Sequence, residues 1–367
     1  MRYILTLLFL VLFIFNCHPC QADSYEKIPI YKQINTHKLI VIGQLSGLSN
    51  NVNEFKIVKI IKGAEKKKIL FVASPRMGFF ERPITNVNNI GELYLLFLNR
   101  ESNGTEFVLD SFQAIVRISA EDDPQLRAVE IMYKLLQVEE EQRVTLLDEV
   151  WVNESNKTKY ELLQEFYYWK SDSVVKFLSN ALRSDDFSLM EHANIVIKVH
   201  GYRETIPILI ESVLQRDSIH AARTLGELKA QEGYEAIIEA INNPEFGSKT
   251  YLPIALGDLG DPRAIPVLIR LLNVKVGENN EDWQLDGNGY AALALAKLKA
   301  VEAIKPIIDR LEKGGYADTK IIDALGEFGT DAKEALPLLL KILVADEDNQ
   351  TRNCVQRAID KIEGRNK

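Results

Sequence analysis

The chain has 367 residues, of which 46% are hydrophobic and 26% are charged, a globular composition that is long enough for two or three domains. Its formal net charge is −8, with 44 basic against 52 acidic residues. This balance argues against the class of proteins that hold nucleic acid non-specifically through clustered lysine and arginine, so no nucleic-acid partner is expected.

The chain begins with the pattern of a secretory signal peptide. Arg2 precedes twelve uncharged, mostly aliphatic or aromatic residues, Ile4 to Phe15, and the small residue Ala22 ends the segment. Twelve helical residues span roughly 18 Å, too little for a hydrocarbon core of about 30 Å, which disfavours a stable membrane span. We predict a signal peptide over residues 1–22, cleaved after Ala22, and a secreted or periplasmic protein. Lipid modification of Cys17 stays open, although the bulky residues before it disfavour a lipoprotein signal.

Removal of this segment leaves Cys354 as the one cysteine of the chain. An exported protein with a single thiol has no internal disulfide, so its core must be stable without one. Cys354 lies in the last helical pattern, where a buried and inert thiol is expected.

Residues 24–119 contain the short, β-branched runs that are typical of strands. The runs cover residues 38–45, 54–61, 68–73, 92–98, 106–109 and 114–118, separated by Gly, Asn and Pro clusters. They predict an all-β barrel or sandwich. The segments LIVIGQLSG, FKIVKIIKG and GELYLLFL resemble the netrin-like and tissue-inhibitor-of-metalloproteinase barrels, which are OB-fold relatives. The resemblance implies a closed barrel, but the inhibitory mechanism is not carried over, because this domain lacks the family's N-terminal cysteine and disulfides.

Within this domain the loop at residues 74–83 is unusual, because Phe79 and Phe80 stand next to each other between two arginines. Aromatic, methionine and arginine side chains are enriched at the cores of protein interfaces, so the loop is a candidate partner contact. The alternative is that both rings fold back and fill the mouth of a small barrel. Both interpretations stay open, and the packing role is favoured.

Residues 120–190 are predicted to form a helical bridge that caps the first repeat. Apolar residues recur with helical spacing from Val129 to Leu136, and further helical patterns follow to Leu178. We expect the aromatic run Phe166–Trp169 to pack at a domain junction rather than to bind a ligand.

From about residue 191 to 363 the chain repeats itself. The block Leu225-Gly226-Glu227-Leu228 returns in similar form at residues 256–259, 295–298 and 325–328, at separations of 31, 39 and 30 residues. Recurrence at this period is typical of stacked helical hairpins that bury their apolar faces against one another. We predict about five units, each made of a helix A, a tight turn and a helix B.

Local signals mark the ends of these helices. Gly260 and Gly329 suit a left-handed residue that terminates helix A, and Asp261 is placed to cap the next helix. Four prolines recur early in helix B, where a missing N–H group costs little: Pro207, Pro266, Pro306 and Pro337.

The segments ALGDLGDPRAIPVLIRLL (residues 255–272) and ALGEFGTDAKEALPLLLKIL (residues 324–343) resemble HEAT repeats in the short form of phycobilisome-lyase-type proteins. The resemblance implies a right-handed α-solenoid with helix B on its concave face, acting as a binding scaffold. The predicted fold class is therefore multidomain α and β: a small N-terminal β-barrel of the OB or netrin-like type, followed by a solenoid of HEAT-like helix pairs.

Aligning the units on helix B places five charged residues at one equivalent position, directly after a buried aliphatic pair. They are Glu211, Glu239, Arg270, Asp309 and Lys341. On a concave face such a column is expected to contact another protein or a peptide. The alternative is the solvated surface that every soluble helix presents, which is favoured for each residue taken singly.

The sequence contains no pattern for catalysis, a metal or a cofactor. Its histidines form no HExxH pair and show no zinc-ligand spacing with cysteine: His18, His37, His192, His200 and His220. Residues 277–289 form an acidic, glycine-rich insertion with a lone Trp283. Read as a calcium loop from Asp282, it has Gly287 at position six but Leu293 where a bidentate glutamate is needed. Calcium binding and a partner contact through Trp283 stay open, and a tolerated insertion is favoured.

We therefore predict a non-catalytic, extracytoplasmic scaffold that binds a protein or peptide. Two alternatives from other classes remain: an enzyme or enzyme subunit related to the bilin lyases, and a protease-inhibitor-like barrel module. The sequence leaves the identity of the partner and the oligomeric state open.

Overall fold

The structure is a computed structural model, and it describes residues 29–49, 52–65, 69–73, 89–100, 107–108, 115–120, 122–246, 249–274, 287–313, 318–345 and 348–365. The chain divides into two compact units, Met1–Tyr133 and Lys134–Lys367. Residues 1–22 and the candidate contacts Phe79, Phe80 and Trp283 lie outside the described residues. Within the described ranges, no helix combines the length and the apolar character needed to cross a membrane.

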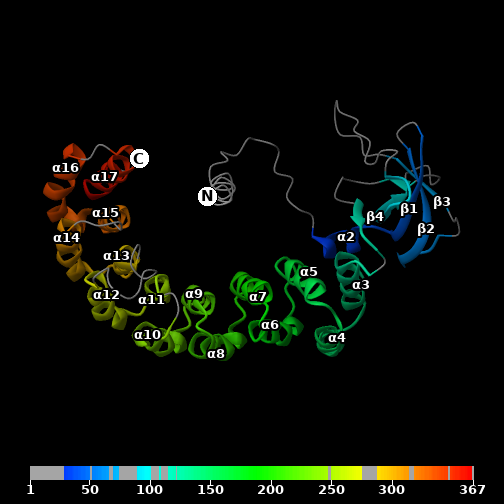
Figure 1. The fold of residues 1–367 in the computed structure, drawn as a ribbon, viewed down its shortest axis with the longest axis horizontal. Coiled ribbons are helices and arrows are strands. Elements are labelled where there is room, and N and C mark those ends of the chain that lie inside the picture. The colour runs from blue at the N-terminus through cyan, green and yellow to red at the C-terminus, as the bar shows by residue number, and fades with distance from the viewer. Residues whose placement is uncertain are drawn as a thin grey trace, which may run out of the picture. The chain divides into compact units, whose positions relative to one another are not determined.

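The first unit is a small sheet with a helix before it and a helix after it (Figure 1). Its elements are α2 (Ile30–Thr36), β1 (Leu39–Ser49), β2 (Val52–Lys62), β3 (Ile69–Ala73), β4 (Leu93–Arg100), β5 (Phe107–Val108), β6 (Ile115–Ile118) and α3 (Pro124–Gln137), the last of which runs into the second unit. Antiparallel ladders join β1 to both β2 and β4, β2 to β3, and β4 to β6. The expected strands are therefore present.

Strand β1 lies at the centre of this unit. Ile40, Val41 and Ile42 are successive residues that point to alternate faces, and each is 0% exposed, so both faces of β1 are covered. Gly43 follows them on the same strand, where a Cβ atom would stand 3.0 Å from the Cβ of Phe55. The missing side chain lets Phe55 enter the core, where its ring meets Tyr94 of β4 at 5.7 Å between centroids.

The sheet differs from the closed barrel that the netrin-like resemblance implied. Strand β5 joins β3 through only two residue pairs, in parallel, and joins β4 through two more. The longer ladders run in the order β3-β2-β1-β4-β6. The described residues thus form a mainly antiparallel sheet without a continuous barrel wall, and the prediction of a closed barrel is wrong for this part of the chain.

The second unit is helical and repeats one arrangement: an A helix, a short 3₁₀ turn and a B helix (Figure 1). After α4 (Glu140–Asn153), the A helices are α5 (Asn156–Phe166), α7 (Phe187–His200), α9 (Ile219–Glu227), α11 (Leu252–Leu259), α13 (Gly287–Lys297), α15 (Asp318–Glu327) and α17 (Asn349–Ile362). The B helices are α6 (Val175–Leu182), α8 (Ile206–Arg216), α10 (Tyr234–Asn242), α12 (Ile265–Leu272), α14 (Ile304–Glu312) and α16 (Leu336–Ala345). The 3₁₀ turns before the B helices are η3 (Asp172–Val174), η4 (Arg203–Thr205), η5 (Gln231–Gly233), η6 (Pro262–Ala264), η7 (Val301–Ala303) and η8 (Gly329–Ala335).

Each pair packs against the next one along the chain. From α5 to α17 every A helix contacts the following A helix, and every B helix contacts the A helix that comes after it. The same arrangement is already present in α5, η3 and α6, ahead of residue 191, where the repeats were predicted to begin. The predicted boundaries at residues 119 and 190 stay predictions, as does the solenoid formed by the whole array.

The recurring Leu-Gly-Glu-Leu block marks the point where successive A helices meet. A Cβ atom on Gly226 would stand 2.6 Å from the carbonyl oxygen of Ala255, and one on Gly257 would stand 2.8 Å from the Cα of Ala294. Gly326 has the same relation to Ala358, at 3.0 Å. The glycine thus recurs because it lets two helix backbones approach more closely than any side chain permits.

The predicted helix ends are confirmed. Gly260 and Gly329 have positive φ angles of 77° and 57° at the ends of α11 and α15, and the Asp261 carboxylate accepts a hydrogen bond from the backbone N–H of Arg263. The four recurring prolines occupy the second or third residue of their B helices. Cys354 is buried, as predicted. These features are local, which is why the sequence alone predicts them.

Candidate functional site

The five charged residues predicted to form a column stand in register. Each is the sixth residue of its B helix: Glu211 in α8, Glu239 in α10, Arg270 in α12, Asp309 in α14 and Lys341 in α16. Glu239, Arg270 and Lys341 are exposed, whereas Glu211 and Asp309 are partly buried. The 3₁₀ turn before each helix sets this register, because it fixes where the helix begins.

Three members of this B-helix column interact with other residues of the array. Glu211 accepts from Arg183, at the end of α6, with an N–O distance of 2.9 Å. Hydrogen bonding by the Arg183 guanidinium lowers the pKa of Glu211. Arg270 donates to the side-chain oxygen of Asn242, the last residue of α10, at 2.9 Å. The sixth residue of one B helix therefore connects to the end of the preceding one.

Asp309 pairs at 2.7 Å with Lys305, one turn earlier in the same helix. Such contacts between partly exposed groups contribute little stability. Within the B-helix column, the exposed Glu239 and Lys341 are the best placed for a partner to reach. The column offers charge and hydrogen bonding, which suits binding rather than bond-breaking chemistry.

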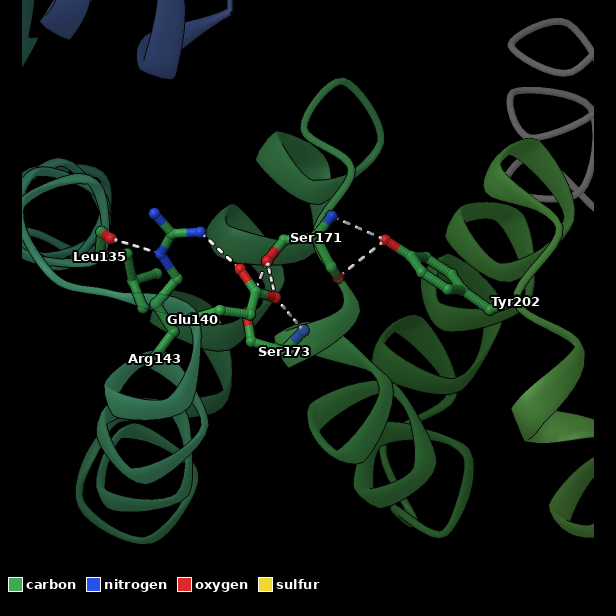
Figure 2. Close-up of polar contacts among 6 residues, drawn as sticks. All are labelled: Leu135, Glu140, Arg143, Ser171, Ser173 and Tyr202. Atoms are coloured by element: carbon green, nitrogen blue, oxygen red, sulfur yellow. Dashed lines mark hydrogen bonds and ion pairs between the residues drawn. The ribbon is translucent and has the colours of Figure 1, made fainter.

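A second polar group, which sequence reasoning missed, lies at the start of the helical unit (Figure 2). Glu140 of α4 accepts two hydrogen bonds at 2.7 Å, one from the Ser171 hydroxyl and one from the Ser173 backbone N–H. Arg143 pairs with the other Glu140 oxygen at 2.6 Å, and its Nε donates to the carbonyl oxygen of Leu135 at 2.8 Å. The cluster thus joins α4 to the turn that precedes α6.

The same cluster reaches the next helix pair through Tyr202. The Tyr202 hydroxyl accepts from the Ser171 backbone N–H and donates to the Ser171 carbonyl, both at 3.0 Å (Figure 2). Burial, above all, raises the pKa of this phenol. Tyr202 is 3% exposed and Ser171 is 8% exposed, so a substrate has little access to either hydroxyl.

The protonation state of Glu140 also argues against catalysis at this cluster. Burial by itself would raise the pKa of the Glu140 carboxyl, but the hydrogen bonds from Ser171 and Ser173 and the charge of Arg143 outweigh it and lower the pKa. A carboxylate with a lowered pKa is a weak general base. The cluster is therefore a structural connection between helix pairs. No local sequence signal reveals it, because Glu140 and Ser171 are 31 residues apart.

A third feature runs along the A helices. The A helices α7, α9, α11, α13 and α15 are each followed by a residue with a positive φ angle. The residues that stand nine positions before these five residues form a column: His192, His220, Tyr251, Tyr290 and Lys320. Tyr251 and Tyr290 are 5.1 Å apart between ring centroids, and the Lys320 ammonium lies 5.0 Å from the Tyr290 ring. His192 meets Tyr160 of α5 at 4.5 Å. Counting back from the helix ends would have revealed this A-helix column in the sequence.

The contacts of the A-helix column show what its members do. Contacts between aromatic rings, and between a cation and a ring, stabilise the packing of neighbouring helices. These side chains therefore hold each A helix against the next one. His192 and His220, which form no metal-binding pattern in the sequence, are among them. Over the described residues, no three or more His, Cys, Asp or Glu side chains come together as a possible metal site.

Comparison with known proteins finds a family match to one helix pair. Residues 254–273 match the family described as PBS lyase HEAT-like repeat. They cover most of α11, the turn η6 and all of α12. The comparison with curated proteins finds no match to the chain. The second unit is thus rich in helical repeats, of which at least one is HEAT-like.

Proposed function

We propose that this protein is a non-catalytic, extracytoplasmic scaffold that binds another protein or a peptide along its B helices. In this proposal the helix pairs form a right-handed α-solenoid, with the B helices on the concave face, and no cofactor takes part. The observation that carries it is the register of the B-helix column, in which the repeat holds five charges at one equivalent position. Stacked repeats commonly use such a surface to bind extended partners.

A site-specific cross-linking experiment tests the binding surface. A photoreactive residue at Glu239, which is exposed within the B-helix column, should give adducts with one protein or peptide from the extracytoplasmic fraction. The matched control is Asn353, which is exposed on α17 and lies outside the column. The charge reversal Glu239→Lys should weaken capture. Equal adduct yields from Glu239 and Asn353 would remove the support for this surface.

Export is tested separately. The basic Arg2, the apolar segment Ile4 to Phe15 and the small Ala22 support it. The protein recovered from the extracytoplasmic fraction should begin at Asp23 when its N-terminus is sequenced. Recovery of the intact N-terminus in the cytoplasm contradicts this part of the proposal and leaves the binding surface untouched.

The family match at residues 254–273 also favours a second candidate, an enzyme or enzyme subunit of the bilin-lyase type. That function predicts that the purified protein binds a bilin and promotes or reverses its thioether attachment to a cysteine of an acceptor protein. A bilin absorption spectrum that does not change on addition of the protein would eliminate this candidate.

A further inference from the structure

Four asparagines of the chain stand two residues before a serine or a threonine: Asn103, Asn153, Asn156 and Asn349. This spacing is the acceptor pattern for N-linked glycosylation, a modification of exported chains. A chain of this composition contains about two such triplets by chance. The excess makes the four asparagines candidate modification sites.

Three of the four asparagines share a longer pattern, Glu-x-Asn-x-Thr. It reads ESNGT at residues 101–105, ESNKT at residues 154–158 and EDNQT at residues 347–351. By chance, a chain of this composition contains well under one asparagine with an acid two positions before it and a hydroxyl two positions after it. Asn153 departs from the pattern, because Trp151 precedes it and Ser155 follows it. The recurring pentapeptide indicates one recognition event that reads a carboxylate, an amide and a hydroxyl together.

The two described members of this group occupy equivalent places at the two ends of the row of A helices. Asn156 is the first residue of α5, the first A helix, and Asn349 is the first residue of α17, the last A helix of the described chain. Both asparagines are exposed. The inner A helices of the described chain, from α7 to α15, begin with other residue types. The pattern therefore marks the ends of the array, while Asn103 lies outside the described residues.

The most exposed apolar side chains of the described residues occur close to these asparagines in the sequence. Val152 is 79% exposed and Val344 is 88% exposed, more than any other large apolar side chain that the structure describes. Val152 stands four residues before Asn156, and Val344 stands five residues before Asn349. Terminal repeats need a polar outer surface, and an N-linked glycan is bulky and solubilising. Sugars at Asn156 and Asn349 would supply the polarity that these apolar side chains lack.

We propose that Asn103, Asn156 and Asn349 are N-glycosylated and that Asn153 is not. The inference rests on the proposed export, because the glycosyl donor it requires is a lipid-linked oligosaccharyl diphosphate outside the cytoplasm. In the transfer, the side-chain Nδ2 attacks the anomeric carbon of the sugar. The new N–C bond replaces the bond between that carbon and the diphosphate oxygen. The nitrogen loses one proton to solvent, and the lipid diphosphate leaves with the bonding electron pair.

The folded structure indicates when the transfer takes place. Thr158 is 2% exposed, so its hydroxyl can be read only before α5 packs. The Thr351 hydroxyl donates to the Asp348 carboxylate at 3.0 Å, a contact that forms with α17. In the folded chain Nδ2 of Asn156 donates to the Asp186 carboxylate at 3.1 Å, and the transfer leaves one N–H on this nitrogen. The modification therefore accompanies export and precedes complete folding.

Mass spectrometry of the full chain, recovered from the extracytoplasmic fraction of its native host, tests this proposal. The intact mass should exceed that of the polypeptide, and peptide mapping should place sugar on the three asparagines of the Glu-x-Asn-x-Thr pattern. Asn156→Gln and Asn349→Gln should each remove one glycan. Thr351→Ala keeps the acceptor asparagine but should remove the same glycan as Asn349→Gln. Glu347→Gln should also remove most of it, because the pattern includes the carboxylate.

Two exposed asparagines serve as matched controls. Asn353→Gln lies four residues after Asn349 in α17, where Val355 takes the place of the hydroxyl, so the glycan content should not change. Asn153→Gln should likewise change nothing, and a sugar on Asn153 would overturn the requirement for the glutamate. A protein that begins at Asp23 and carries no sugar overturns this inference and leaves export standing. A cytoplasmic protein with an intact N-terminus contradicts export, and this inference with it.

Discussion

Gly257 provides the sharpest test of how the A helices hold the array together. It is the glycine of the Leu-Gly-Asp-Leu block in α11, and it faces α13. In Gly257→Ala the new Cβ atom would stand 2.8 Å from the Cα of Ala294 and 2.9 Å from its Cβ. Carbon atoms pack best at about 3.5–4.0 Å, so the two helices must separate by close to 1 Å. Both opposing atoms belong to a helix backbone or are fixed to it, which leaves no flexible side chain to absorb the displacement.

The magnitude follows from two opposing effects. Overpacking of a well-packed contact costs about 1–3 kcal/mol. Replacing a helical glycine by alanine gains about 0.5–1 kcal/mol, because the unfolded chain loses conformational freedom. Since Gly257 meets rigid atoms, the packing cost exceeds the gain, and we expect Gly257→Ala to lower the free energy of unfolding by about 1–2 kcal/mol.

Urea unfolding followed by helical circular dichroism measures this loss as a shift in midpoint. Repeat arrays can unfold in segments, so amide hydrogen exchange of α11 and α13 should accompany it. The control is Glu239→Ala in α10, an exposed position where the change should stay within about 0.5 kcal/mol. If Gly257→Ala equals or exceeds the parent chain in stability, helix propensity governs this contact and the argument from close approach fails.

Three further substitutions test other local features. Lys299 follows α13 with a φ angle of 55°, so Lys299→Gly should raise stability by about 1 kcal/mol through relief of the left-handed strain, and an unchanged melting temperature would contradict this. Asp261→Ala removes the cap on the Arg263 N–H group and should cost about 1 kcal/mol in urea unfolding, whereas Asp261→Asn should recover most of it. The pKa of Glu140 is lowered from its ordinary value of 4.5 in the folded chain, so its stabilising contribution is present above pH 4.5 and is lost as the pH falls through the folded pKa. The stability difference between the parent and Glu140→Gln should therefore shrink on acidification, and a difference independent of pH would refute the charged role of Glu140.

The sequence by itself determined the features that depend on a few neighbouring residues. The period of the Leu-Gly-Glu-Leu block predicted helix pairs, and Gly260, Asp261 and the early prolines predicted where the helices end, because turn and cap geometry is set within a few residues. The register of the B-helix column followed from the same signals. Runs of β-branched residues likewise predicted most of the strands of the first unit.

Tertiary structure decided everything that depends on which segments meet. The pairing of β1 with β4, the short ladders of β5 and the absence of a continuous barrel wall in the described sheet depend on contacts between distant strands. Ser171 and Ser173, which donate hydrogen bonds to Glu140, and Arg183, which pairs with Glu211, stand 28 to 33 residues from these carboxylates. Sequence patterns specify that a side chain is apolar or charged, but its burial and its partner arise only when the helices pack, because the free energy of these contacts depends on the whole arrangement of neighbours.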